Sequence, residues 1–293
     1  MSTPTTTPRT DEATTRTPRG ARPWMVVGDD RTESAAGVWG WVAAQPWPGW
    51  RVTAVTARPT EDGAPGDRAA PHAWQPVPLR ELAGTDVEHV LAEADPRTVL
   101  DGYRDADLLV IGPRGPGLLK RLHLGSTAEW LVSGHRPLAP VVIARSTEPV
   151  RSVLVCADGS PDALDAVRTF AGLPLAREAE VTVLGVDAPE GGTRAAVVEA
   201  AHELRAAGVG QVRTLLVGAV PMTVTFDVRP TILGMIEKAE PDLVVVGTRG
   251  LSGLRRAVMG STASAVVHHA RCSVLVGRAG DRGRSADPVS EVR

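Results

Sequence analysis

The stretch Leu243-Val-Val-Val-Gly247-Thr-Arg-Gly250 is separated by nine residues from Gly260-Ser261, and a helical pattern follows over Thr262–Ala270. An apolar run, a glycine-bearing loop and a helix start in this order predict a strand–loop–helix unit. Glycines let backbone N–H groups approach an anion closely, and a serine at the helix start adds a hydroxyl where the helix dipole is positive. The stretch therefore predicts a phosphate-binding turn in an α/β fold.

The same pattern occurs once more, earlier in the chain. The apolar run Leu108-Leu-Val-Ile111 is followed by the same Gly-x2-Gly-x9-Gly-Ser spacing, at Gly112, Gly115 and Gly125-Ser126. A repeat with constant spacing indicates duplication of a whole structural unit. We therefore expect two similar domains, at residues 23–146 and 150–278.

Composition agrees with a globular protein of two domains. The chain has 293 residues, with 43% hydrophobic and 23% charged residues and a formal net charge of -2. This charge offers no general attraction for nucleic acid or membrane surfaces, and no apolar run is long enough to span a bilayer. Cys156 and Cys272 are isolated in apolar runs, which suits a reducing compartment. We expect a cytoplasmic protein with a disordered Thr/Pro/Arg tail at 1–22 and a flexible tail at 279–293.

The second half alternates strands and helices. Its strand-like runs are continuously apolar, which is typical of a parallel sheet covered on both faces. The expected strands are Ser152–Ala157, Glu180–Asp187, Val212–Val217, Asp242–Gly247 and Ser273–Val276, and the helices between them are Ala163–Gly172, Thr193–Ala207 and Thr231–Ala239, the last opened by Pro230.

The first half repeats this order imperfectly. Its strands are expected at Trp24–Gly28, Arg51–Thr56, Val87–Glu93, Leu108–Gly112 and Val141–Ala144, with helices at Ser34–Ala44, after Pro96 and after Ser126. Local periodicity also allows a helix over Val87–Ala94, and we choose a strand because the repeat places it opposite Val212–Val217. Five prolines in Pro59–Leu79 predict a shortened or lost crossover helix. The linker is expected near Arg145–Arg151.

These motifs resemble the universal stress proteins. The resemblance rests on both glycine motifs, on Ala157-Asp158-Gly159-Ser160 after the first strand, and on the closing Val266-Val-His-His-Ala-Arg-Cys-Ser-Val-Leu-Val276. Two copies in one chain are similar to the tandem actinobacterial members. The resemblance implies ATP-binding, doubly wound parallel-sheet domains with strand order 3-2-1-4-5. It also implies pairing through the fifth strand, as a homodimer or as a pseudo-dimer within one chain.

The resemblance also assigns roles to residues of the second repeat. Asp158 is expected beside the ribose and phosphates of ATP, with Mg²⁺ as a candidate accompanying ion. Gly247 and Gly250 are expected to line the loop, and Gly260 with Ser261 to hold the phosphates. Val186, at the end of the second strand, is the expected backbone contact for adenine. Tight turning at the glycines and simple helix capping by Asp158 remain alternatives.

In the first repeat, Asp30 takes the place of Asp158, and the set is completed by Gly112, Gly115, Gly125 and Ser126. Two differences distinguish the first repeat from the second. Arg31-Thr32 replaces Gly159-Ser160, and Asp29 adds a second carboxylate, which is unfavourable near phosphates unless a base offsets it. We therefore expect the second repeat to bind nucleotide more tightly.

The chemistry expected at these sites is binding without turnover. The sequence contains no Gly-x4-Gly-Lys-Ser/Thr motif and no evident cluster of a base with metal ligands. We expect an ATP-dependent regulator or sensor in a stress response, and not an enzyme. A slow ATPase and a scaffold that binds no nucleotide remain alternatives. The seven tryptophans, all in the first half, are expected to fill the core and interfaces.

Overall fold

The structure of the protein is a computed structural model that describes residues 22–31, 33–57, 82, 84–114, 124–133, 139–187, 192–218, 221–222, 225–250 and 259–278. The segment Pro59–Leu79, Gly115 and both predicted tails, apart from Arg22, lie outside these residues. No helix of the described part of the chain is long and apolar enough to cross a membrane.

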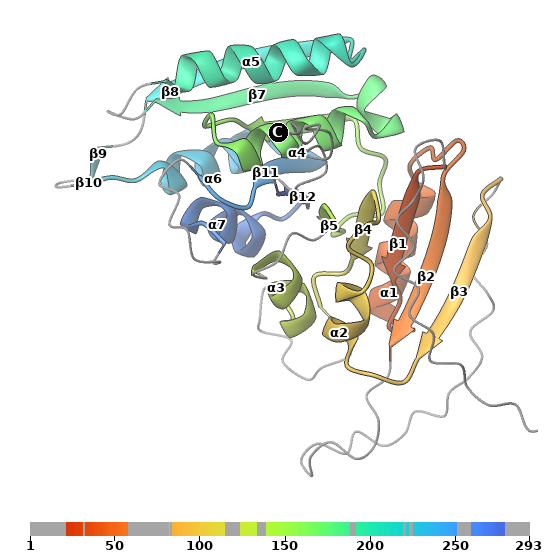
Figure 1. Cartoon of the computed structure of the whole chain (residues 1–293). Helices are drawn as coiled ribbons and strands as arrows, with labels where there is room; N and C mark the ends of the chain where they lie inside the picture. The colour runs from red at the N-terminus through yellow and green to blue at the C-terminus, as the bar shows by residue number, and fades with distance from the viewer. Residues whose placement is uncertain are drawn as a thin grey trace, which may run out of the picture.

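The first repeat has the predicted order of elements (Figure 1). The elements are β1 (Trp24–Gly28), α1 (Glu33–Ala43), β2 (Arg51–Ala57), β3 (Val87–Ala92), α2 (Pro96–Asp101), β4 (Leu108–Ile111), α3 (Ser126–Ser133) and β5 (Val141–Ile143). The strand chosen for Val87–Glu93 is confirmed, because β3 pairs in parallel with β2.

The second repeat contains the predicted elements and three small additions. It comprises β6 (Ser152–Cys156), α4 (Pro161–Ala171), the 3₁₀ turn η1 (Pro174–Arg177), β7 (Glu180–Asp187), α5 (Thr193–Ala206), β8 (Gln211–Gly218), β9 (Pro221–Met222), β10 (Thr225–Phe226), α6 (Val228–Ala239), β11 (Leu243–Gly247), α7 (Ser261–His269) and β12 (Ser273–Gly277). The turn η1 and the antiparallel pair β9–β10 were not predicted.

Two helices begin earlier than expected, for the same reason. Ser160 caps α4 by accepting a hydrogen bond from the N–H of Ala163, and Asp227 caps α6 by accepting one from Arg229. Pro161 is therefore the first residue of α4, and Pro230 lies within the first turn of α6. A proline costs little there because the first N–H groups of a helix have no partner within it.

The strands of both repeats form one ten-stranded sheet in the order β3-β2-β1-β4-β5-β12-β11-β6-β7-β8. Each half has the predicted order 3-2-1-4-5 and is parallel. The halves meet where β5 and β12 pair antiparallel, with Val142 opposite Leu275. The two repeats are therefore joined through their fifth strands within a single chain (Figure 1).

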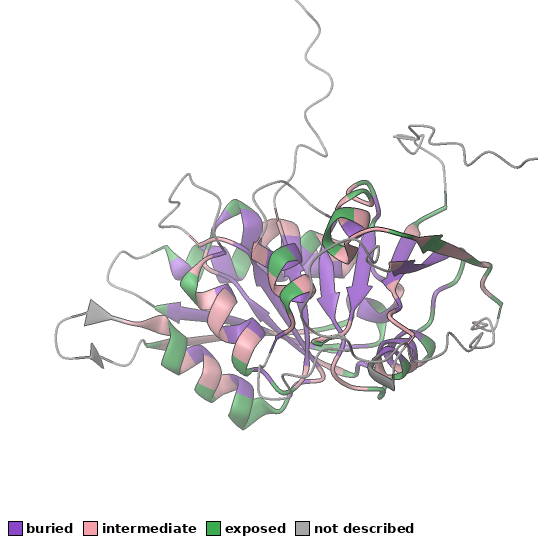
Figure 2. Ribbon diagram, turned by 90° about the horizontal axis from the view of Figure 1, so that it is seen from below, coloured by how far each residue is buried: buried purple, intermediate pink, exposed green. Residues whose placement is uncertain are grey.

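Helices cover both faces of this sheet, and each face has its own apolar cluster that runs through both repeats. The first cluster contains residues of α1, α4 and α5, and the second contains residues of α2, α3, α6 and α7. Trp39, Trp41 and Trp47 are buried in the first cluster, which confirms their expected role as core residues. Buried strands run between helices whose outer sides are exposed (Figure 2).

Candidate nucleotide site

A cavity lies at the carboxyl ends of β6, β7 and β11 in the second repeat. Its volume is about 120 Å³, and its lining includes all six residues predicted for this repeat: Asp158, Val186, Gly247, Gly250, Gly260 and Ser261. The chain leaves β6 towards α4 on one face of the sheet and leaves β11 towards α7 on the other. Such a point, where the connections diverge, is where open α/β sheets bind ligands.

One end of the cavity is apolar. Its walls are buried or nearly buried side chains from β6, β7, β11, α6 and α7: Cys156, Leu184, Val186, Val246, Ile232 and Ala263. Burial raises the pKa of the Cys156 thiol to about 12, so this wall stays neutral at physiological pH. A flat heterocycle with apolar faces fits this lining chemically.

Val186 gives this end a polar edge. The carbonyl of Leu184 accepts a hydrogen bond from Ala157 at the end of β6. Alternate residues of a strand direct their backbone groups to the same neighbour, so the N–H and carbonyl of Val186 face the same side. The hydroxyl of Thr193 donates to that carbonyl at 3.4 Å, and a carbonyl oxygen has two lone pairs.

The other end of the cavity is polar, and its lining includes the charged residues Asp158 and Arg249. Oδ1 of Asp158 accepts a hydrogen bond from the N–H of Ser160 at 2.9 Å. A Cβ atom at Gly250 would lie 2.9 Å from Oδ2 of Asp158, which is closer than ordinary contact. Glycine at position 250 therefore lets the loop approach the carboxylate.

The N-terminus of α7 forms the wall opposite Asp158. The N–H of Gly260 donates to the carbonyl of Thr248 at 2.7 Å, which closes the loop on itself. Gly260 is the N-cap of α7, and none of the described side chains caps this helix. The first N–H groups of α7 are therefore available for an anion in the cavity, where Ser261 and Thr262 lie.

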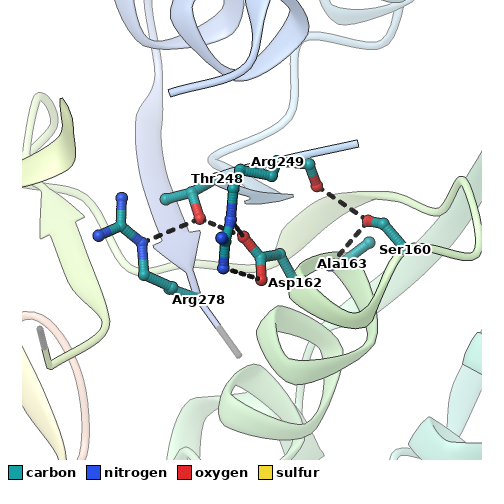
Figure 3. A network of polar contacts seen from close by, with 6 residues as sticks. All are labelled: Ser160, Asp162, Ala163, Thr248, Arg249 and Arg278. Atoms are coloured by element: carbon teal, nitrogen blue, oxygen red, sulfur yellow. Dashed lines mark hydrogen bonds and ion pairs between the residues drawn. The ribbon is translucent and has the colours of Figure 1, made fainter. Parts of the chain in front are cut away.

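A polar network that contains the buried residues Asp162 and Thr248 and the partly exposed Arg249 lies behind the loop (Figure 3). Oδ2 of Asp162 accepts hydrogen bonds from Thr248 Oγ1 at 2.6 Å and Arg249 Nε at 2.8 Å, and Oδ1 accepts one from Arg249 Nη2 at 3.1 Å. Arg278 Nε donates to Thr248 Oγ1 at 3.2 Å. The bond to Asp162 raises the pKa of Arg249, whereas burial lowers the pKa of Arg278.

Gly247 lines the cavity but is required for a different reason. A Cβ atom on it would lie 2.4 Å from the backbone nitrogen of Ala163 and 2.6 Å from the carbonyl carbon of Asp162. The absence of a side chain therefore permits α4 to pack on β11. At this glycine, close packing of helix on strand explains the residue type better than access to an anion.

The protein is similar to a known family model, to proteins of known sequence and to solved structures. The model of the universal stress protein family matches residues 149–278. A universal stress protein of Mycobacterium tuberculosis is 31% identical over 196 residues, which cover 62% of this chain and 65% of that protein. The chain is therefore similar to universal stress proteins, and the family model covers its second repeat. The match spans less than two thirds of the length of this mycobacterial relative.

Solved universal stress proteins have the same fold. One from Archaeoglobus fulgidus superposes with a TM-score of 0.63 at 19% identity, covering 88% of this chain and 98% of that protein. A smaller one from Arabidopsis thaliana, solved with AMP bound, covers 46% of this chain and 97% of its own length, with a TM-score of 0.34 and 18% identity.

The first repeat has a similar turn. Gly125 donates from its N–H to the carbonyl of Pro113 at 2.7 Å, as Gly260 does to Thr248 in the second repeat. Gly112 and Ser126 lie at either end of this loop, next to β4 and in α3, and Asp30 follows β1. Gly115 lies outside the described residues.

The expectation for Asp29 was wrong. Asp29 is buried, and its carboxylate accepts hydrogen bonds from the indole N–H of Trp39 in α1 and from the N–H of Arg31, both at 2.8 Å. Successive residues of an extended chain point to opposite sides, so Asp29 faces the core while Asp30 does not. Asp29 therefore does not act as an extra anion at the phosphate turn.

Several residues around the second site were not predicted individually. Ser160, Thr248, Arg249 and Thr262 line the cavity, and Asp162 supports it from behind. Ser160 before Pro161 does carry a capping signal. Asp162 carries none, because an acidic residue in the first turn of a helix usually complements the dipole and is solvated. Within the described residues, no group of three His, Cys, Asp or Glu side chains is able to hold a metal ion.

Proposed function

We propose that the protein is a cytoplasmic regulator that binds ATP in the second-repeat cavity and changes its interactions in a stress response. Similarity to the universal stress proteins supports the general role in stress. The observation that carries ATP binding is the cavity itself, which combines an apolar end with an uncapped helix N-terminus and a glycine loop.

Each end of the cavity matches one part of ATP. Adenine fits the apolar end, where the backbone of Val186 offers a donor and an acceptor to the edge of the base. The phosphates would bind at the loop and α7, and Asp158 would hold the ribose or an accompanying Mg²⁺. The cavity is smaller than the roughly 300 Å³ that is usual for ligand pockets, so the triphosphate is expected to extend outwards over the loop.

Calorimetric titration tests this proposal, with a matched pair of variants. Gly260→Glu places an anion at the second phosphate turn, and Gly125→Glu places one at the first. ATP should bind the wild type more tightly than GTP, and the tighter site should be lost only in Gly260→Glu.

Thermal unfolding gives a second measurement. At a hundredfold excess over Kd, ATP should stabilise the fold by about 2.7 kcal/mol. An unchanged melting temperature in millimolar MgATP, with no heat of binding, would refute ATP binding.

The proposal also holds that bound ATP is not turned over at an appreciable rate. Hydrolysis requires a positioned base for the attacking water, usually together with metal ions at the phosphates. Release of inorganic phosphate from purified protein should therefore stay at background over hours. Metal-dependent release that disappears in Asp158→Ala would instead support the alternative of a slow ATPase.

A further inference from the structure

We propose that Asp162 is a positioning residue that holds the glycine loop of the second repeat in its phosphate-binding shape, and that the first repeat lacks this support. The inference rests on the proposed ATP function. Asp162 is 3% exposed, lies in the first turn of α4 and is not part of the cavity lining. It would therefore act through Thr248 and Arg249, without touching the nucleotide.

The contacts of these two residues show how the support reaches the site. Both side chains bond to Asp162 (Figure 3), and both backbone carbonyls accept hydrogen bonds from other parts of the site. The carbonyl of Thr248 accepts from the N–H of Gly260, which is the cap of α7. The carbonyl of Arg249 accepts from the hydroxyl of Ser160 at 2.9 Å. The carboxylate of Asp162 thus holds Thr248 and Arg249 at the start of the loop. Through their carbonyls, these two residues are bonded to the end of the loop and to the turn that carries Asp158.

Burial makes this arrangement rigid. A buried carboxylate that loses its partners is strongly destabilised, so Asp162 favours the one loop geometry that satisfies it. Arg278 adds a donor to Thr248 from the end of β12, at the far side of the network. The network therefore connects α4, the loop and β12, which are distant in sequence.

The first repeat has other residue types at the positions equivalent to Asp162 and Thr248. The register of β1 on β4 and of β6 on β11 makes Ser34 and Pro113 the equivalents of Asp162 and Thr248. A serine supplies no carboxylate, and a proline supplies no hydroxyl. The first repeat therefore cannot build the same carboxylate–hydroxyl bond behind its loop.

Both arginines are retained, and one of them, Arg145, has different partners from its equivalent. Arg114 and Arg145 occupy the positions of Arg249 and Arg278. Arg145 donates from its guanidinium to the carbonyls of Val267 and Cys272, which belong to the second repeat. In the second repeat the equivalent arginine supports the loop, whereas in the first it fastens the two repeats together.

The test compares ATP with adenosine, which keeps base and ribose but has no phosphates. Asp162→Asn and Thr248→Val should each weaken ATP binding at least tenfold, which is about 1.4 kcal/mol. Adenosine binding should change less than twofold. Thr248→Ser, which keeps the hydroxyl, should restore the affinity for ATP. Ser34→Ala, at the matching position of the first repeat, should leave both affinities unchanged.

The outcomes separate this inference from the proposed function. A wild-type protein that binds neither ligand would overturn both. Wild-type affinity for ATP in folded Asp162→Asn, or equal losses for ATP and adenosine, would overturn only the positioning role. Circular dichroism shows whether Asp162→Asn folds. If it does not, Thr248→Val is compared with Thr248→Ser, and equal ATP affinities in these two variants would overturn the inference.

Discussion

At the residue scale, one backbone position distinguishes the two repeats. Gly159 and Arg31 occupy equivalent places after the first strand, and both have positive φ, at 84° and 57°. The left-handed conformation costs a non-glycine residue roughly 1–2 kcal/mol. In the first repeat, hydrogen bonds from Arg31 to Asp29 and to Thr56 accompany this conformation. In the second repeat, a Cβ on residue 159 would lie 3.3 Å from the Cβ of Ala196 in α5.

We predict that Gly159→Ala lowers the free energy of unfolding by about 1–2 kcal/mol, through the left-handed conformation alone. Gly234→Ala is the control, because Gly234 lies within α6 and its Cβ would meet nothing within 4 Å. That substitution should stabilise the protein by about 0.5–1 kcal/mol. Urea denaturation measures both changes. Equal effects in the two variants would contradict the argument.

The Cys156 thiol predicts a dependence of stability on pH. Burial raises its pKa from 9.0 to about 12 in the folded protein. The folded state therefore retains the proton at a pH where the unfolded state has lost it. The stabilising contribution is complete below pH 9 and is lost as pH rises towards 12. Between pH 8 and pH 10, wild type should lose about 1 kcal/mol more stability than Cys156→Ala does in denaturation measurements. Equal losses would show that the thiol does not carry the effect.

At the element scale, the contact between helix and strand differs between the repeats. The backbone of α4 lies against Gly247 at the end of β11, where a Cβ would come within 2.4 Å of it. A Cβ on Gly112 would meet a methyl carbon of Val38 at 3.2 Å and the carbonyl oxygen of Arg114 at 3.3 Å. Backbone cannot move away without shifting the whole helix, but a side-chain methyl group can rotate. The second repeat therefore tolerates less change at this point than the first.

We predict that Gly247→Ala lowers the free energy of unfolding by about 3 kcal/mol, because overpacking a tight contact forces backbone shifts. The matched variant Gly112→Ala should cost about 1 kcal/mol, at the lower end of such effects. Midpoints of denaturant unfolding give the comparison. A larger cost in Gly112→Ala would mean that the first repeat has the tighter contact.

At the scale of the whole molecule, the junction between the repeats decides how they unfold. The strands β5 and β12 are buried and pair antiparallel, and Arg145 bridges from the first repeat to the C-terminal end of α7. Across the same junction, His268 of α7 lies 3.1 Å from Glu129 of α3. The C-terminal end of α7 thus contacts the first repeat, while its N-terminal end forms the second site.

We predict that Arg145→Met lowers stability by about 2 kcal/mol, since bonds from a charged donor are worth roughly 1.5–3 kcal/mol. The two repeats should then unfold in separate steps, where the wild type unfolds in one. Arg151→Met, at an exposed position near the end of the linker, is the control and should change neither quantity. Denaturation followed by circular dichroism and tryptophan fluorescence reports on this, because all tryptophans lie in the first half. A single unchanged transition in Arg145→Met would argue against the bridge.

The sequence by itself determined the repeat, the order of the main strands and helices, and six of the residues that line the second cavity. These features depend on local patterns: apolar runs, glycine spacing and capping residues act within a few positions of one another. The strand at Val87–Ala92 is an intermediate case, because its local pattern was ambiguous and only comparison of the repeats decided it.

Only the tertiary structure decided the direction of Asp29 and the support that Asp162 gives to the loop. Asp162 and Thr248 are 86 positions apart, and no local pattern indicates that they meet. The glycine at 247 was recognised, but its close contact with α4 follows from how the helix lies on the sheet. Such features depend on which distant elements pack together. Packing depends on the fit of side chains throughout the core, so it cannot be inferred from a short stretch of sequence.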